Sequence, residues 1–275
     1  MLIISNGAYK SGSTWLFHIL NHLTDGSAPP EPFRNPKWKK PSLKPGDSLN
    51  QFLASGIYEQ TDILSKNHLS ISDLQKCPPY LGANFKIFNI TRDYRDVVVS
   101  AYFHAIREGL PYEHFWAYYW FQGRKLHKDV KEKNVAFAEI LKAHPLDAVE
   151  LSYEGLKKDF AKEVRMAAKI LDIELSDDQI SELQQATSFN SMRSKSDGES
   201  VVHGKQFFRK GVVGDFSKYY SKLMLRDFEG IENSSGGNWV NSVADALYPI
   251  RRLLLGIYFR VLTIRRRFFA KPANP

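Results

Sequence analysis

The hydrophobic pattern of the chain alternates between short apolar runs and longer segments with helical spacing. An apolar run, Leu2–Ser5, is followed by apolar positions that recur at helical spacing from Trp15 to Leu23. A second run, Phe85–Ile90, comes before a segment of helical character over residues 97–106. Each of these pairs predicts a strand, a loop and a helix.

The same order continues in the second half of the chain. A third apolar run, Ala148–Leu151, precedes a helical pattern over residues 156–171. Ser176 and Gln179 have the spacing of a capping box, which predicts the start of another helix. Strands that alternate with helices predict an α/β fold in which a P-loop-like parallel sheet carries helices on both faces. Its ligand is expected at the carboxyl ends of the strands.

Length and charge divide the chain into a large body and a short tail. At 275 residues with 43% hydrophobic residues, the chain can bury a sizeable core, and we expect one domain over residues 1–245. The net charge is +8, but residues 246–275 contain the basic side chains between Arg251 and Lys271 and no acidic residue. Most of the positive charge therefore lies in the tail, and the nearly neutral body argues against a nucleic-acid-binding protein.

The cysteine content and the first residues bear on where the protein works. Cys77 is the only cysteine, so the chain can form neither an internal disulfide nor a multi-cysteine metal site. The chain reaches the polar Ser5 without a cationic leader or a long apolar segment. These features predict a cytoplasmic location.

A glycine-containing loop follows the first predicted strand and opens the first predicted helix. Residues 7–15 read GAYKSGSTW, in which Gly7 and Gly12 have the spacing of a P-loop. The lysine, however, is Lys10, and Ser13 stands where a P-loop has its lysine. Backbone N–H groups and the dipole at a helix N-terminus favour a phosphate, so this loop is a candidate phosphate site.

This loop resembles the 5′-phosphosulfate loop of the sulfotransferases that use 3′-phosphoadenosine 5′-phosphosulfate (PAPS), whose usual form is Tyr-Pro-Lys-Ser-Gly-Thr-Thr-Trp. Thr91–Ser100 resembles the family's 3′-phosphate segment, in which Arg92 and Ser100 have the required spacing. Phe208–Phe216 resembles the family signature Arg-Lys-Gly-x-x-Gly-Asp-Trp, and two shorter segments between them resemble adenine-side segments. The resemblance implies the following donor-binding residues: Lys10, Ser11, Gly12, Ser13, Thr14, Trp15, Arg92, Ser100, Tyr153, Thr187, Phe189, Arg209, Lys210 and Gly211.

The residue types suit a nucleotide with phosphate groups at both ends of its ribose. Arg92 and Arg209 can donate bidentate hydrogen bonds, and a flexible glycine lets backbone amides approach. Trp15 and Phe189 offer flat apolar faces for a purine. Taken singly, each arginine is also compatible with a surface ion pair, and each aromatic ring with core packing.

The resemblance also implies the catalytic groups. The family places Lys-Thr-His at the end of a strand before the 3′-phosphate arginine, and LSKNHLS occupies residues 64–70 here. His68 is then the general base, a role that suits its near-neutral pKa. Lys66 would stabilise the transferring sulfuryl group and Lys10 the leaving phosphate oxygen. We expect direct in-line transfer to a hydroxyl or amine, with 3′-phosphoadenosine 5′-phosphate (PAP) as product and no metal. The alternative for His68 is a structural histidine.

The chain departs from the family pattern at four places. Ala8-Tyr9 replaces Tyr-Pro before the lysine, Asp93-Tyr94 replaces Asn-Pro after the arginine, Asn67 replaces threonine before the histidine, and Phe216 replaces tryptophan. None of these changes removes a charged group from the expected chemistry. They indicate a divergent member, such as a microbial one.

The acceptor and the rival activities are left open. Residues 115–121 are rich in aromatic side chains where the family builds part of its acceptor wall, although a helix cannot point every ring at one ligand. A small molecule, a glycan and a lipid-linked acceptor all fit. The rival enzyme is a P-loop kinase of small molecules, which needs a Mg²⁺ ligand after the loop lysine, and the displaced Lys10 argues against it.

The tail carries a prediction of its own. Between residues 250 and 268 apolar side chains recur at helical spacing, while Arg252, Arg260 and Arg267 fall toward the other side. This pattern predicts a basic amphipathic helix that lies on an anionic membrane surface, which would make the protein peripheral on the inner membrane face. The alternatives are packing on the body or on a second subunit, and a basic membrane-binding module without enzymatic activity. The sequence leaves the oligomeric state open.

Overall fold

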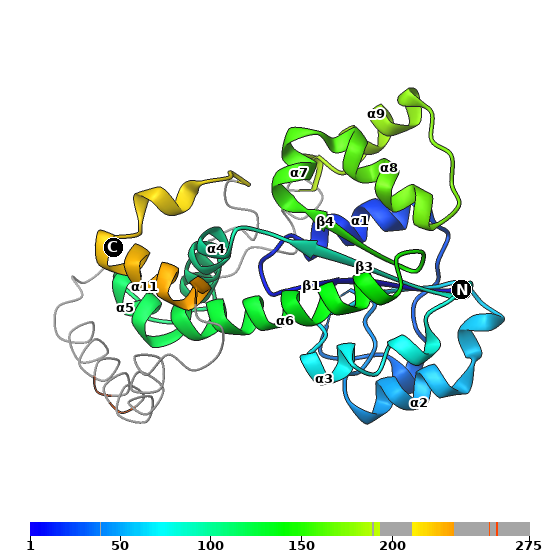
Figure 1. The fold of residues 1–275 in the computed structure, drawn as a ribbon, viewed down its shortest axis with the longest axis horizontal. Coiled ribbons are helices and arrows are strands. Elements are labelled where there is room, and N and C mark those ends of the chain that lie inside the picture. Colours follow the sequence, from blue (N-terminus) through cyan, green and yellow to red (C-terminus); the bar gives the residue numbers. More distant parts are fainter. Residues whose placement is uncertain (39, 189, 193–210, 234–252, 254–256, 258–275) are drawn as a thin grey trace, which may run out of the picture.

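The computed structural model describes residues 1–38, 40–188, 190–192, 211–233, 253 and 257. Phe189, Arg209, Lys210 and most of the tail lie outside the described residues, and the predictions made for them stay predictions. A parallel β-sheet forms the centre of the fold, with strand order β2-β1-β3-β4 (Figure 1). The strands are β1 Leu2–Gly7, β2 Ile63–Lys66, β3 Phe85–Thr91 and β4 Ala148–Ser152.

The register of the strands places their carboxyl ends at one edge of the sheet. Ser5 of β1 lies opposite Lys66, the last residue of β2. Gly7, at the end of β1, lies opposite Ile90 of β3. Thr91 of β3 lies opposite Ser152, the last residue of β4. The loops that follow all of these strands therefore start close together, where ligands of parallel sheets are usually bound.

Both faces of the sheet are covered by helices, because alternate side chains of each buried strand point to opposite faces. Ile3 packs in one hydrophobic cluster with α1 and α8, whereas Leu2 and Ile4 pack in another with α2 and α6. The helices of the first face are α1 Ser13–Leu23, α7 Tyr153–Lys158, α8 Phe160–Ile170 and α9 Asp177–Ala186, and those of the second are α2 Asp47–Ser55, α3 Ile71–Leu74 and α6 Arg124–Ala143 (Figure 1). The predicted α/β fold with helices on both faces is confirmed, as is the capping box of Ser176 and Gln179 at the start of α9.

A third cluster of buried side chains is largely aromatic and lies beside the sheet, around α4 (Figure 1). Phe115, Tyr118 and Tyr119 are buried in it, whereas Trp116 is 53% exposed. Most of the aromatic segment is therefore core. The elements of this region are α4 Tyr94–Arg107, α5 Phe115–Tyr118, the π-helix η4 Tyr119–Gly123, the 3₁₀-helix η5 Asp215–Lys218 and α11 Lys222–Asn233. Short 3₁₀-helices elsewhere are η1 Glu31–Phe33, η2 Ile57–Glu59 and η3 Pro78–Tyr80.

A buried polar contact fastens α11 to the rest of this region. The Asp227 carboxylate accepts a hydrogen bond from the Tyr119 hydroxyl over 2.7 Å and one from Arg124 Nε over 3.0 Å. Charge-assisted hydrogen bonds of this kind are the strong ones in protein interiors. Asp227 therefore holds the helix that follows the 211–218 segment.

Candidate functional site

The loop between β1 and α1 has a backbone conformation that suits an anion. Lys10 has φ 68° and Gly12 has φ 106°, and a non-glycine residue adopts such left-handed values only with some strain. The Ser11 hydroxyl donates to the Ala8 carbonyl over 2.7 Å and closes the turn. α1 then begins at Ser13 with no acidic side chain in its first turn. Its N-terminal amides and dipole favour a phosphate.

Close packing also determines the shape of this loop. A Cβ atom on Gly12 would lie 2.8 Å from a ring carbon of Tyr153, so only glycine fits there. Ser11 and Ser13 are buried, and Thr14 is half-buried in the first turn of the helix. The predicted phosphate loop is thus held between β1, α1 and the start of α7.

Cationic side chains gather around the loop. Burial, followed by repulsion from Arg107, Arg92 and Lys66, lowers the pKa of Lys10 to about 7. Burial and the neighbouring Lys40 lower the pKa of Lys66 to about 8. An anion placed among these like charges would relieve their repulsion and raise both pKa values.

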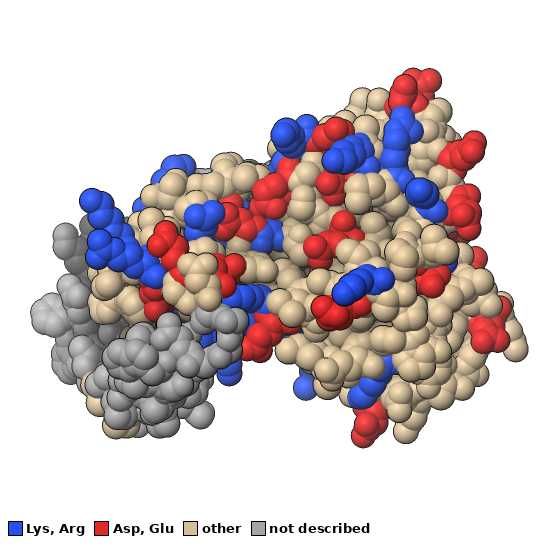
Figure 2. All heavy atoms as spheres, in the orientation of Figure 1, with Lys and Arg blue, Asp and Glu red and all other residues tan. Residues whose placement is uncertain are grey.

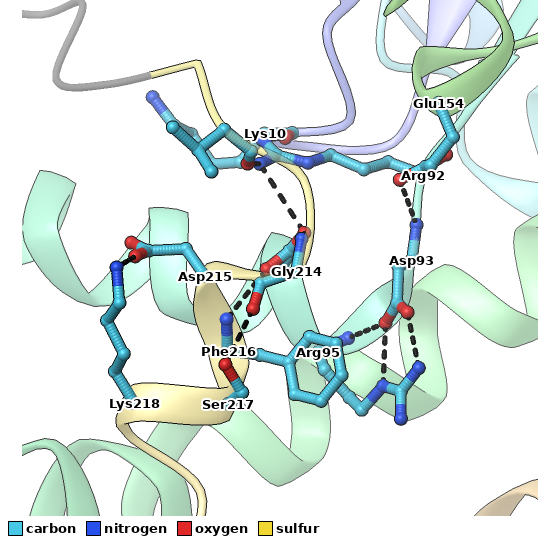
Figure 3. Close-up of polar contacts among 12 residues, drawn as sticks. Lys10, Arg92, Asp93, Arg95, Glu154, Gly214, Asp215, Phe216, Ser217 and Lys218 are labelled. Carbon is cyan, nitrogen blue, oxygen red and sulfur yellow. Dashed lines mark hydrogen bonds and ion pairs between the residues drawn. The ribbon is translucent and has the colours of Figure 1, made fainter. Parts of the chain in front are cut away.

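Arg92 lies at the end of β3 and reaches toward the phosphate loop (Figure 3). Its Nη1 donates to the Lys10 carbonyl over 3.5 Å, and its Nη2 donates to the Val212 carbonyl over 3.2 Å. The guanidinium carbon lies 4.3 Å from the centre of the Tyr153 ring. Arg92 Nε is buried and has no hydrogen-bond partner among the described residues. A buried donor of this kind is rare in proteins and is a candidate contact for a ligand oxygen.

The turn after Arg92 is built by local hydrogen bonds. The Asp93 carboxylate accepts from the Arg95 amide over 2.9 Å and caps α4, while the Asp93 amide donates to Glu154 over 3.1 Å (Figure 3). Ser100, predicted to assist Arg92, lies in the same helix and is half-buried. Gly211, also predicted, begins the described part of the C-terminal segment with φ 61°.

The residues predicted to bind adenine are more deeply packed than expected. Trp15 is 9% exposed, and its ring lies 5.5 Å from that of Tyr153 and is stacked at 6.2 Å on Phe160. Thr187 is fully buried, and its hydroxyl donates to the Leu183 carbonyl over 2.8 Å at the end of α9. Most of the surface of Trp15 and all of the surface of Thr187 is therefore already in contact with protein.

His68 lies just beyond the end of β2, beside the phosphate loop. Its Nδ1 is 2.5 Å from the Gly7 carbonyl, and because a carbonyl only accepts, Nδ1 must carry the proton. Nε2 is then the proton acceptor of the neutral ring. Burial, followed by repulsion from Lys66, lowers the pKa of His68 to about 3, although the Gly7 carbonyl partly opposes this shift. The ring is therefore neutral at physiological pH, and Trp38 flanks it at 4.9 Å.

Buried amides hold the segment around His68. The Asn6 side chain accepts a hydrogen bond from the Leu69 amide over 2.9 Å. Asn67, which stands where the family has threonine, donates to the Leu43 carbonyl over 3.1 Å. Asn67 is therefore buried and bonded to the protein, whereas the neighbouring His68 is half-buried.

Two residues of the site were not predicted. The Tyr9 ring lies 6.3 Å from His68 and 5.5 Å from His104, and Tyr9 is 40% exposed. Burial, followed by Lys10 and Arg107, lowers the pKa of His104 to about 4. The signal for His104 was its position one helical turn after Ser100, because residues four apart share a helix face. The signal for Tyr9 was its place inside the motif of residues 7–15, directly before Lys10.

The described residues contain no group of three or more His, Cys, Asp or Glu side chains arranged to hold a metal ion. No helix in the described part of the chain is both long enough and apolar enough to cross a membrane.

Solved structures of other proteins share this fold. The mouse sulfotransferase SULT7A1, complexed with PAP, aligns with a TM-score of 0.62 at 23% identity, over 89% of this chain and 88% of that one. Retinol dehydratase in a complex with retinol and PAP aligns with a TM-score of 0.62 at 18% identity, over 84% of this chain and 80% of that one. At these identities the likeness shows a common fold.

Sequence comparisons show the family. Human sulfotransferase 6B1 is 25% identical over 236 residues, which are 80% of this chain and 71% of the relative. Mouse sulfotransferase 1B1 is 26% identical over 244 residues, which are 81% of this chain and 78% of the relative. The family model of the sulfotransferase domain matches residues 2–234. The chain therefore belongs to the sulfotransferase domain family.

Proposed function

We propose that this protein transfers the sulfuryl group of PAPS to a hydroxyl or amine of an acceptor and releases PAP. The observation that carries the proposal is the buried Arg92 Nε, which has no partner among the described residues and lies at the sheet edge shared by Lys10 and His68. A phosphate oxygen would satisfy this donor and balance the surrounding positive charge. SULT7A1 and retinol dehydratase, which share the fold, were solved with PAP.

The donor is proposed to lie across the carboxyl edge of the sheet. The amides at the start of α1, together with Lys10, would hold the 5′-phosphosulfate. Arg92 and Ser100 would hold the 3′-phosphate, and Gly211 would bring a backbone amide to the same group. Among the other donor contacts proposed from sequence, those at Arg209, Lys210 and Phe189 belong to undescribed residues.

In the proposed reaction the acceptor oxygen or nitrogen bonds to sulfur while the bond from sulfur to the leaving phosphate oxygen breaks. The proton of the acceptor passes to His68 Nε2, the atom that the Gly7 contact leaves as acceptor. Lys10 neutralises the growing charge on the phosphate oxygen, and Lys66 stabilises the sulfuryl oxygens. The anionic sulfuryl group beside His68 would raise its low pKa during transfer, because an opposite charge favours the imidazolium.

The acceptor is proposed to approach from the side of Tyr9 and His104. The Tyr9 ring lies 6.3 Å from the ring of His68 and 5.5 Å from that of His104, and the exposed part of Tyr9 offers an apolar face beside the base. Retinol dehydratase was solved with retinol in one structure and with androsterone in another. These complexes favour a small-molecule acceptor for this chain, and a glycan or lipid-linked acceptor is proposed as the alternative.

The charge of the described surface favours a local role for the site cations. Figure 2 shows acidic and basic side chains interspersed over the visible face, with no continuous basic field. Nucleic-acid-binding proteins usually carry a clustered basic surface that tracks the phosphate backbone. The cations around Lys10 are better suited to one small anionic ligand.

Titration calorimetry with PAP and, separately, with ATP and Mg²⁺ tests the proposed class. We expect tight binding of PAP that is unchanged by EDTA, and much weaker binding of ATP. Transfer of label from ³⁵S-labelled PAPS to a panel of phenols, sterols, glycans and glycolipids would then identify the acceptor. Preferential, Mg²⁺-dependent binding of ATP would contradict the proposal and favour the kinase alternative.

A further inference from the structure

A buried carboxylate at the start of α4 makes contacts that the proposed chemistry does not use. Asp96 is 2% exposed. Its Oδ2 accepts a hydrogen bond from the Gly214 amide over 2.7 Å, and its Oδ1 accepts one from the Phe216 amide over 2.9 Å. These amides lie in the turn seen in Figure 3, far along the chain from α4. Asp96 thus bonds the C-terminal segment to the helix that follows Arg92.

Only a carboxylate suits this position. Gly214 has φ 79°, and the left-handed turn presents two amides to one side, each of which needs an acceptor. An ionised aspartate accepts both bonds, whereas asparagine has a single oxygen and would turn its NH₂ group toward one of the amides. The ring of Phe216 is held as well, since the Arg95 guanidinium carbon lies 3.8 Å from its centre.

The segment that Asp96 fastens also orients Arg92. The Val212 carbonyl, two residues before Gly214, accepts the hydrogen bond from Arg92 Nη2 over 3.2 Å. Asp96 Oδ2 itself lies 4.0 Å from the same Nη2 atom. Together with the Lys10 carbonyl and the Tyr153 ring, these contacts fix the guanidinium plane. The orientation of Nε, the donor assigned to phosphate, follows from that plane.

We propose that Asp96 is a positioning residue for donor binding. By holding the Gly214 and Phe216 amides it keeps the Val212 carbonyl against Arg92, and so sets the direction in which Arg92 presents its donors. This inference rests on the proposed function, because it takes the Arg92 ligand to be a phosphate of PAP.

Electrostatics alone predicts the opposite effect of Asp96 on PAP binding. A carboxylate 4.0 Å from Arg92 opposes a phosphate at the same guanidinium. If charge were all that mattered, Asp96→Asn would tighten PAP binding. If Asp96 instead holds the segment that orients Arg92, the same substitution should weaken PAP binding about 10-fold or more. The reason is that it releases the Val212 carbonyl and with it the orientation of the charged Arg92 donor.

The experiment compares Asp96→Asn with Asp227→Asn, which is matched because Asp227 is also a largely buried carboxylate that accepts hydrogen bonds in the same region. Both variants should lose thermal stability, but only Asp96→Asn should raise the Kd for PAP and the KM for PAPS while leaving the acceptor KM nearly unchanged. Equal or tighter PAP binding by Asp96→Asn would overturn the inference. Failure of the wild type to bind PAP would instead contradict the proposed function.

A double-mutant cycle with Arg92→Ala tests the route of the effect. If Asp96 acts through Arg92, Asp96→Asn should weaken PAP binding much less in the Arg92→Ala background. An undiminished effect there would contradict the route. If Asp96→Asn does not fold, amide hydrogen exchange of the wild-type protein tests the inference instead. PAP should slow exchange at the Gly214 and Phe216 amides, and unchanged exchange there would overturn the inference.

Discussion

Binding of PAP at slightly alkaline pH should be accompanied by proton uptake at Lys10. Burial and the nearby cations Arg107, Arg92 and Lys66 lower the pKa of Lys10 to about 7. A bound phosphate favours the charged form of lysine and should raise this pKa. With a pKa of about 7, about three quarters of Lys10 is neutral at pH 7.5. If the pKa rises by about two units on binding, about 0.7 proton is taken up for each PAP bound.

The affinity for PAP should depend on pH with a definite sign. Lys10 must be protonated to attract phosphate, so its contribution is fully present below pH 7 and is lost as the pH rises through the pKa of the unliganded protein. The slope should approach a tenfold loss for each pH unit, until the pH passes the raised pKa of the complex. The pH range from 7 to 9 is therefore the informative one.

Calorimetry in buffers of different ionisation enthalpy, such as HEPES and Tris at pH 7.5, measures the uptake directly. The observed binding enthalpy varies with the ionisation enthalpy of the buffer, and the slope is the number of protons exchanged. Protons exchanged by PAP itself should contribute little to this number, because the second ionisation of its phosphate groups has a pKa of about 6 and is nearly complete at pH 7.5. The low pKa values of His68 and His104, about 3 and about 4, keep both rings neutral at this pH.

Lys10→Arg is the matched control, because arginine keeps the charge but stays protonated throughout this pH range. This variant should bind PAP with little proton uptake and with a much flatter dependence on pH. Lys66→Arg should remove only a smaller share of the uptake, since Lys66 has the higher pKa of about 8. Equal enthalpies in both buffers for the wild type, or full uptake by Lys10→Arg, would refute the reasoning.

Three further predictions concern the base, the 3′-phosphate contact and the tail. His68→Ala should lower turnover by roughly 10² to 10⁴ and leave PAP affinity nearly intact. If the variant kept wild-type turnover, His68 would be a structural histidine and not the base. Arg92→Ala should weaken PAP binding in calorimetry by about 1.5 to 3 kcal/mol, and unchanged affinity would remove the 3′-phosphate assignment. In co-sedimentation with vesicles, the whole chain should bind anionic lipid in a salt-sensitive way and a protein ending at Asp245 should not. Equal partitioning of the two would contradict a membrane role for the tail.

Much of the candidate site could be predicted because its residues directly follow strands. Gly7 ends β1 and Arg92 comes one residue after β3, so these two motifs were recognisable by their place after an apolar run. Lys66 ends β2, but the pattern did not predict this short strand, and only the family resemblance located the segment of Lys66 and His68. In a parallel sheet the ends of the strands meet at one edge, and the topology therefore brings these groups together without any knowledge of side-chain contacts. Recognition of the motifs and of the fold relied on this local order.

Other parts of the site depend on contacts between segments far apart in the sequence. The partners of Asp96 lie in a turn that follows β4 and its helices, and no spacing rule connects them. Tyr9 becomes a neighbour of His104 only when α4 packs beside the phosphate loop. The hydroxyl of Thr187 already bonds within α9, which the motif could not show.

The sequence by itself determined the alternation of strands and helices, the position of the phosphate loop and the types of groups that follow each strand, because hydrophobic periodicity and glycine placement act over a few residues. Only the tertiary structure decided which aromatic rings of residues 115–121 are core, which nitrogen of His68 carries the proton and how far the pKa of Lys10 is lowered. Each of these depends on burial and on hydrogen-bond partners from distant segments, and burial is a property of the packed chain rather than of its local pattern.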